Sequence, residues 1–327
     1  MTTDTELLEA FDARAKRRDS RRDFFKAFGT ASAVAGGFVL ATKSDPLSAQ
    51  AAPSDADILN FALNLEYLEA QFYSFAANGV GLPANLLSGP GATGTATGGR
   101  RVTFTDPVVA QYAREIAADE IAHVTFLRSA IGATAVGQPA IDIGATPDGA
   151  FSTAARASGL IPAGASFDPY ASDEAFLLAA FIFEDVGVTA YKGASPLLAN
   201  KVFLEAAAGI LAVEAYHAAI IRTTLYAKGM ATPTAMIGTR TIIEATESVS
   251  GARDSLDGAS DLDQGVRATG SGATTASNIA PLDADGIAYS RSPGQVLNIV
   301  YLNRAAVTGG GFFPAGVNGT LRLSAAN

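Results

Sequence analysis

Both histidines of this chain lie three residues after a glutamate. One pair is Glu120 and His123 in DEIAHVTF, and the other is Glu214 and His217 in VEAYHAAI. With 12 glutamates among 327 residues, chance places a glutamate at this spacing before both histidines with a probability of (12/327)², about 0.0013. Carboxylate and imidazole together form a ligand set that suits iron or manganese. The two pairs therefore indicate a metal site.

Each pair is expected to lie in the apolar stripe of a helix, because residues three apart share one helix face. A lone charge in such a stripe is costly, and a metal ion removes that cost by binding both side chains. The alternatives are a buried Glu–His hydrogen bond or an exposed pair, and a single pair would favour them. Two pairs on two long helices favour metal binding. The stripes read Ala113, Ile116, Glu120, His123, Leu127 and Ala207, Ile210, Glu214, His217, Ile221.

Four segments have the apolar spacing and the end signals of long helices. Each is about 20 to 30 residues long, which is normal for a four-helix bundle. Long connections follow the first and second segments, and the second connection, residues 133–171, lets the third helix run in a new direction. The segments run from Ser54 or Asp55 to Gly79, from Thr105 or Asp106 to Gly132, from Ser172 to about Gly193, and from about Pro196 or Asn200 to Gly229.

A dimetal bundle site also needs one glutamate from each of the other two helices. When Tyr73 of the first helix is aligned with Tyr191 of the third, Glu66 matches Glu184, each seven residues before its tyrosine. Glu69 then falls opposite a glycine, so it is a less favoured ligand and a candidate neighbour or bridge. The tyrosines either hydrogen-bond the ligand carboxylates or are ordinary core residues. The repeated order of these residues indicates an internal duplication of a helix pair.

Other acidic residues near these motifs receive plainer interpretations. Glu115 and Asp119 are expected on a solvated helix face, and Asp185 is expected to point away from Glu184. The chain has no cysteine, so thiolate metal sites and cysteine nucleophiles are excluded. Its two histidines already belong to the pairs, and no Ser–His–Asp arrangement remains. The sequence identifies no catalytic residue beyond the candidate ligands.

Residues 1–51 are predicted to be an export signal. Arg21 and Arg22 are followed by Phe24, Phe25 and Lys26, then by a moderately apolar stretch and a small-residue cleavage motif, most simply cut after Ala51. This arrangement resembles a bacterial twin-arginine signal. The resemblance implies a periplasmic or otherwise exported protein that crosses the membrane folded. An uncleaved basic helix or membrane anchor is the alternative, and no permanent membrane span is expected in the mature chain.

Residues 52–230 are predicted to form the bundle, and residues 231–327 a C-terminal extension that packs on it. Residues 247–278 are polar, rich in Gly, Ser and Thr, and without a clear period. They are expected to be a structured coil over the bundle or partly disordered. Apolar residues return in SPGQVLNIVYLN and GGGFFPAGVNG and are expected to dock on the bundle.

These motifs resemble the ferritin-like superfamily, specifically exported bacterial ferritin-like domain proteins related to plant desiccation-related proteins. The resemblance implies an all-α fold, a ferritin-like antiparallel four-helix bundle with long loops and an irregular C-terminal extension. The export signal, the long connections and the extension depart from storage ferritins and argue against an iron cage. The implied metal ligands are Glu66, Glu120, His123, Glu184, Glu214 and His217.

Two functions from different classes fit this ligand set. Four carboxylates balance two divalent ions, iron or manganese, and such a pair is suited to chemistry with a small oxidant such as O₂ or peroxide. A ferroxidase, peroxidase or catalase-like enzyme of oxidative or desiccation stress is one hypothesis. A non-catalytic structural or protective module with a structural or vestigial metal site is the other. The formal net charge of −9 excludes a basic nucleic-acid footprint, and a homo-oligomer is compatible with the sequence.

Overall fold

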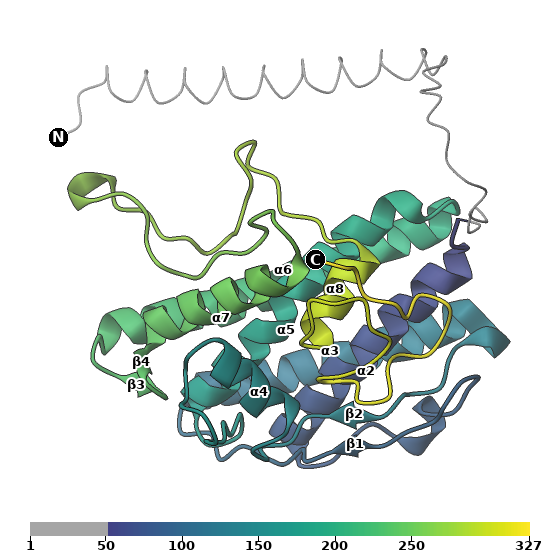
Figure 1. Ribbon diagram of the computed structural model, residues 1–327, viewed down its shortest axis with the longest axis horizontal. Helices are drawn as coiled ribbons and strands as arrows, with labels where there is room; N and C mark the ends of the chain where they lie inside the picture. Colours follow the sequence, from purple (N-terminus) through teal and green to yellow (C-terminus); the bar gives the residue numbers. More distant parts are fainter. Residues whose placement is uncertain (1–51) are drawn as a thin grey trace. The chain divides into compact units, whose positions relative to one another are not determined.

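The computed structural model describes residues 52–327, and the predicted signal segment, residues 1–51, lies outside the described residues. The described chain contains seven α-helices and two short two-stranded sheets (Figure 1). The prediction of an all-α fold is confirmed. Four of the helices, α2, α3, α5 and α6, form the bundle.

The first helix pair of the bundle begins and ends at strong sequence signals. Helix α2 (Asp55–Asn78) begins at a capping box in which Ser54 and Asp57 bond each other's backbone N–H groups. It ends at Gly79, whose φ of +78° is the left-handed conformation that glycine adopts without strain. Helix α3 (Pro107–Ile131) begins with a proline in its first turn, after an aspartate whose side chain accepts from two backbone N–H groups.

The second helix pair is capped by Ser172 and Asn200. Helix α5 (Asp173–Ala194) starts where the Ser172 side chain accepts from the N–H of Ala175. Helix α6 (Lys201–Ala231) starts where Asn200 accepts from the N–H of Val202. Of the two starts that the sequence allowed for the fourth helix, the structure has the one at Asn200. Helix α6 is long and apolar enough to cross a membrane. Its length and composition are weak evidence for a span, because the core helix of a bundle can share both properties.

Neighbouring helices of the bundle run antiparallel. Asn60, near the start of α2, donates to the carbonyl of Thr134 just after the end of α3. Lys228, near the end of α6, lies 3.1 Å from Glu174 at the start of α5 and 3.3 Å from Asp106 at the start of α3. The closest pairings are α2 with α3 and α5 with α6. The long connection between these two pairs returns the chain to the end of the bundle where α3 starts, so that α5 runs parallel to α3.

The two long connections pair with each other beside the bundle. Strand β1 (Ala96–Thr97) in the first connection lies parallel to β2 (Ile141–Asp142) in the second. Helix α4 (Ala150–Ala157), which the sequence analysis missed, also belongs to the second connection. It packs Phe151 against Phe72 of α2, with ring centroids 5.5 Å apart. The connections therefore contribute to the core.

The prediction that residues 247–278 lack regular structure is wrong at their start. Strands β3 (Met236–Ile237) and β4 (Arg240–Thr241) form a hairpin that leads into helix α7 (Ile242–Asp257). The helix is polar enough to hide its period, but Thr241 and Glu244 form a capping box at its start. That motif was the available sequence signal. Helix α8 (Pro293–Val300) follows later in the extension.

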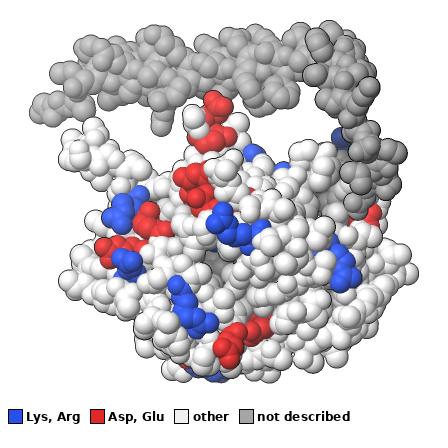
Figure 2. Space-filling model, viewed as in Figure 1, with Lys and Arg blue, Asp and Glu red and all other residues white. Residues whose placement is uncertain are grey.

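The C-terminal extension, residues 231–327, packs on the bundle through aromatic and ionic contacts. Phe312 lies with its ring centroid 5.0 Å from those of Phe151 and Phe183. Arg253 of α7, which is buried, bonds Asp185 of α5 at 3.0 Å. Charged side chains on the face shown in Figure 2 are scattered among uncharged ones, without a dense basic area there.

Candidate metal centre

Six side chains from the four bundle helices form the glutamate–histidine cluster in the core. Each Glu-x-x-His pair lies on one face of its helix, so both members turn inward together. All six residues are at least nine-tenths buried, and His123, at 8% exposure, is the most exposed. The cluster consists of Glu66 of α2, Glu120 and His123 of α3, Glu184 of α5, and Glu214 and His217 of α6.

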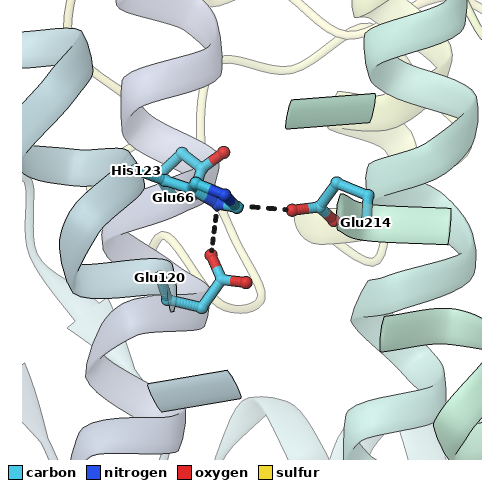
Figure 3. A group of neighbouring side chains, drawn as sticks. All are labelled: Glu66, Glu120, His123 and Glu214. Carbon is cyan, nitrogen blue, oxygen red and sulfur yellow. Dashed lines mark ion pairs between the residues drawn. The ribbon is translucent and has the colours of Figure 1, made fainter. Parts of the chain in front are cut away.

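The first half of the cluster is centred on His123. Its Nδ1 lies 3.2 Å from Oε2 of Glu66, 3.4 Å from Oε2 of Glu120 and 3.8 Å from Oε1 of Glu214. In Figure 3 the imidazole of His123 lies between Glu120 and Glu214. One ligand atom from each of these four residues lies within 4.8 Å of the other three, which is close enough for one cation to bind them.

The second half of the cluster is centred on His217. Its Nδ1 lies 3.1 Å from Oε1 of Glu120 and 3.5 Å from Oε2 of Glu184. These three residues form a second group with the same close spacing of ligand atoms. Glu120 belongs to both groups and presents a different oxygen to each histidine. Its carboxylate is therefore placed to bridge two cations.

The polar atoms that face the centre of the cluster have no hydrogen-bond partner. Buried polar atoms are almost always paired, and an unpaired one costs about 1–3 kcal/mol. Here the unpaired atoms concentrate at one point, which is the pattern that bound cations would resolve. The atoms are Oε2 of Glu66 and Glu184, both carboxylate oxygens of Glu120 and Glu214, and Nδ1 of His123 and His217. The residues present therefore fit a metal site.

Two tyrosines hold the outer oxygens of two of the carboxylates. The Tyr73 hydroxyl donates to Oε1 of Glu184, and the Tyr191 hydroxyl donates to Oε1 of Glu66. In each glutamate this leaves Oε2 directed at a histidine. The tyrosine of each helix bonds the glutamate of the other, which agrees with the duplication that the sequence indicates. Of the two interpretations left open for the tyrosines, the structure has the hydrogen-bonded one.

Asp119 is a partner of the cluster that the sequence analysis missed. It was expected on a solvated face, and its side chain is indeed 43% exposed, but Oδ2 lies 3.1 Å from Nε2 of His217. An Nε2–H that donates to this carboxylate leaves Nδ1 free to bind a metal. Carboxylates commonly orient metal-binding histidines in this way. Glu115, one turn earlier, is exposed as expected.

Glu69 lies next to the cluster but outside both metal-sized groups. In the alignment of the two helix pairs it corresponds to Gly187, and the two residues also lie close together in the structure. A Cβ at Gly187 would lie 3.4 Å from Oε1 of Glu69 and 2.1 Å from Oε2 of Glu214. Any side chain at position 187 would therefore displace Glu214. Asp185 points away from the cluster, toward Arg222 and Arg253, as predicted.

Burial and mutual charge determine how the metal-free cluster holds protons. Burial opposes ionisation of Glu120, but its ion-pair contacts with His123 and His217, at 3.4 and 3.1 Å, outweigh that effect and lower its pKa to about 2. Burial and the charge of Glu120 raise the pKa of Glu66 to about 7. Burial, followed by the charges of nearby glutamates, also raises the pKa of Glu214 well above its ordinary value. Carboxylates of this kind would exchange their protons for metal ions.

The cluster lies within the part of the chain that matches a known family. The sequence profile of the ferritin-like domain family matches residues 54–227, which span the whole bundle up to the last turn of α6. No solved structure matches the chain significantly.

Two characterised plant proteins are similar in sequence. The ferritin-like catalase Nec2 of Nesocodon mauritianus is 30% identical over 277 residues, covering 82% of this chain and 85% of that protein. The desiccation-related protein PCC13-62 of Craterostigma plantagineum is 37% identical over 177 residues, covering 53% of each chain. The first similarity extends beyond the bundle, because the bundle match alone covers only residues 54–227.

Proposed function

This chain belongs to the ferritin-like domain family and is related to desiccation-related proteins, and we propose that it is an exported dimetal protein that destroys peroxide. In this proposal two iron or manganese ions bind the glutamate–histidine cluster. The protein then protects its host against oxidative stress, including the stress of drying.

The position of Glu120 carries the proposal. Its two oxygens face two histidines, and each histidine completes a separate group of carboxylates. A single structural ion would need only one of these groups. Four buried carboxylates balance the four positive charges of two divalent ions, and oxygen and imidazole ligands without sulfur suit iron or manganese.

When bound, a pair of such ions would supply the electron changes by which two molecules of H₂O₂ become two of water and one of O₂. The side chains of the protein would bind these ions and hold the ligand groups in position. The tyrosine hydroxyls fix two carboxylates, and Asp119 fixes the ring of His217. The buried position of the cluster excludes bulk water.

The name of the catalase relative favours peroxide over ferrous iron as the substrate, and the name of the desiccation-related relative supports a role in stress. The proposed place of action is the periplasm or another exported location. Its support is the Arg21–Arg22 motif and the stretch behind it, which lie outside the described residues.

Metal analysis of protein purified from its native host tests the proposal. About two iron or manganese ions per chain are expected, as the shared carboxylate implies. Replacing His123 and His217 together by alanine should remove stoichiometric metal and lower the melting temperature, because mutually repelling carboxylates remain buried. Tyr216→Ala, on the exposed face of α6, is the control and should keep its metal.

Activity assays on the metal-loaded protein separate the proposal from its alternative. We expect peroxide consumption with release of O₂, and slower oxidation of Fe(II). A protein that holds two ions but acts on neither substrate would instead be a protective module with a structural metal site. Full metal content in the double histidine variant would contradict the dimetal site itself.

A further inference from the structure

A small cavity lies between the glutamate–histidine cluster and the C-terminal extension. Its volume is about 20 Å³, more than the roughly 10–15 Å³ that one water molecule needs. On the bundle side it is lined by Glu69, Gly187 and Tyr191, and on the other side by Val300 and Phe312. Bundle and extension therefore close it together.

The cavity borders the proposed metal centre. Tyr191, one of its walls, donates to Oε1 of Glu66. Gly187, another wall, has no side chain, and a Cβ at this position would lie 2.1 Å from Oε2 of Glu214. Both oxygens of Glu214 lack a hydrogen-bond partner. Two walls of the cavity thus adjoin carboxylates from two helices of the cluster, although none of the six cluster residues lines the cavity itself.

Glu69 is the one acidic side chain in the cavity wall. It is 5% exposed, and no hydrogen bond from the described residues, 52–327, reaches its carboxyl group. Apart from Glu69 and Tyr191, whose hydroxyl already bonds Glu66, the wall is apolar. An unpaired carboxyl group in an apolar wall is costly unless a small polar molecule bonds to it.

We propose that this cavity is the peroxide-binding site, that Glu69 positions hydrogen peroxide by a hydrogen bond, and that the extension limits the substrate to that size. Peroxide has O–H groups that need partners in an apolar enclosure, whereas dioxygen has none, so Glu69 favours peroxide. Val300 and Phe312 would exclude organic hydroperoxides. This inference rests on the proposed function, because it places the substrate beside the proposed metals.

Substitutions at Val300 test the size limit. Val300→Ile fills the cavity with one methylene, and Val300→Ala enlarges it. Val296, one turn earlier on α8 and equally buried, does not line the cavity, so the same two substitutions there are matched controls. Circular dichroism would verify that all four variants fold.

Azide binding to the cobalt(II)-loaded full chain gives a readout that does not depend on turnover. The absorption bands of cobalt report azide that reaches the metals. We expect Val300→Ile to weaken azide binding at least about tenfold, the effect of one misfitting methylene in a pocket. Val300→Ala should let the iron- or manganese-loaded enzyme accept methyl hydroperoxide, which the unmodified enzyme rejects. Both Val296 variants should change azide affinity by less than about twofold.

Substitutions at Glu69 test the hydrogen bond. Glu69→Gln keeps a hydrogen-bonding group of the same shape, whereas Glu69→Met removes it. We expect Glu69→Met to raise the KM for hydrogen peroxide at least about tenfold. Glu69→Gln should keep the KM close to that of the unmodified enzyme, and the cobalt content should be unchanged in both variants.

Each outcome decides between the two proposals. If the unmodified chain binds no cobalt, the proposed metal function fails and this inference fails with it. If cobalt binds but the Val300 variants match the Val296 variants in azide affinity, the cavity proposal alone is wrong. Equal KM values in both Glu69 variants and the unmodified enzyme would likewise overturn the role of Glu69.

Discussion

Nε2 of His217 on α6 lies 3.1 Å from Oδ2 of Asp119 on α3. The same ring presents Nδ1 to Glu120 and Glu184 inside the cluster. The ring of His217 thus links the partly exposed carboxylate of Asp119 to the buried cluster. By accepting the Nε2–H it would fix the tautomer in which Nδ1 carries the lone pair that a metal needs.

Removing Asp119 should weaken metal binding without disturbing the fold. We expect Asp119→Ala to reduce the affinity for Mn(II) or Co(II) by about 10- to 100-fold, the usual effect of losing a carboxylate that orients a metal-binding histidine. Because the Asp119 side chain is 43% exposed, the melting temperature of the metal-free protein should change little. Isothermal titration calorimetry measures the affinity.

Glu115→Ala is the matched control for that experiment, since Glu115 is an exposed carboxylate one turn earlier on α3. It carries the same charge but lies outside the cluster. If both variants lose the same amount of metal affinity, a general effect of surface charge would explain the loss, and Asp119 would have no orienting role.

The two tyrosines should contribute to stability in equal and reciprocal ways. Tyr73→Phe and Tyr191→Phe each leave a buried glutamate oxygen without its donor. We expect each substitution to lower the free energy of unfolding of the metal-free protein by about 1–3 kcal/mol. Urea denaturation followed by circular dichroism measures this change.

Tyr216→Phe provides the comparison, because Tyr216 is 71% exposed on α6. It should change the unfolding free energy by less than about 0.5 kcal/mol. A loss of the same size in all three variants would mean that the buried hydroxyls contribute nothing specific to the cluster.

Local signals in the sequence were sufficient to predict the bundle helices. Gly79 and Gly132 mark helix ends, and capping residues mark the starts, because these preferences act within one turn of helix. Helix α7 was missed because its polar composition hides the period, although its capping box was visible. The apolar segments of the extension were expected to dock on the bundle, and Phe312 does so, but the contact of Arg253 with Asp185 could not be read from composition.

The residues of the cluster could be chosen from spacing, but their partners could not. The three-residue spacing of each pair and the internal duplication identify all six residues without knowledge of how the helices pack. The Asp119 bond depends on how α3 and α6 approach each other, and the helical period of α3 alone suggested a solvated face. The empty space at Gly187 likewise becomes meaningful only when Glu214 from α6 fills it.

Export through the twin-arginine route predicts a specific dependence on Arg21 and Arg22. Changing both to lysine keeps the charge but removes the paired guanidinium groups on which the resemblance to a twin-arginine signal rests. We expect the variant to accumulate in the cytoplasm as uncleaved protein, detected by fractionation and mass spectrometry. Changing Arg17 and Arg18 to lysine is the control and should leave export intact. Normal cleavage and export of the Arg21/Arg22 variant would reject this route.

The stability of the metal-free protein should fall as the pH rises from 5 to 8. The pKa of Glu66 is raised from 4.5 to about 7 by burial and by Glu120. Burial lowers the pKa of His123, but its ion-pair contacts with Glu120 and Glu66 outweigh burial and raise that pKa from 6.5 to about 11. Groups with raised pKa values stabilise the fold below their unfolded pKa and lose that contribution as the pH rises through the folded value. The lowered pKa of Glu120 acts in the opposite direction only below about 4.5.

Bound metal should remove this loss, because cations replace the protons that the cluster holds at low pH. Deprotonated ligands bind metal more strongly, so the increase in melting temperature on adding Mn(II) should be larger at pH 8 than at pH 5.5. Differential scanning calorimetry with Mn(II), and with a chelator in its place, measures the increase at each pH. The variant with His123 and His217 both replaced by alanine is the control and should show almost no increase at either pH. An equal increase at both pH values in the unmodified protein would mean that Mn(II) binds elsewhere, since sites on exposed carboxylates are already deprotonated at pH 5.5.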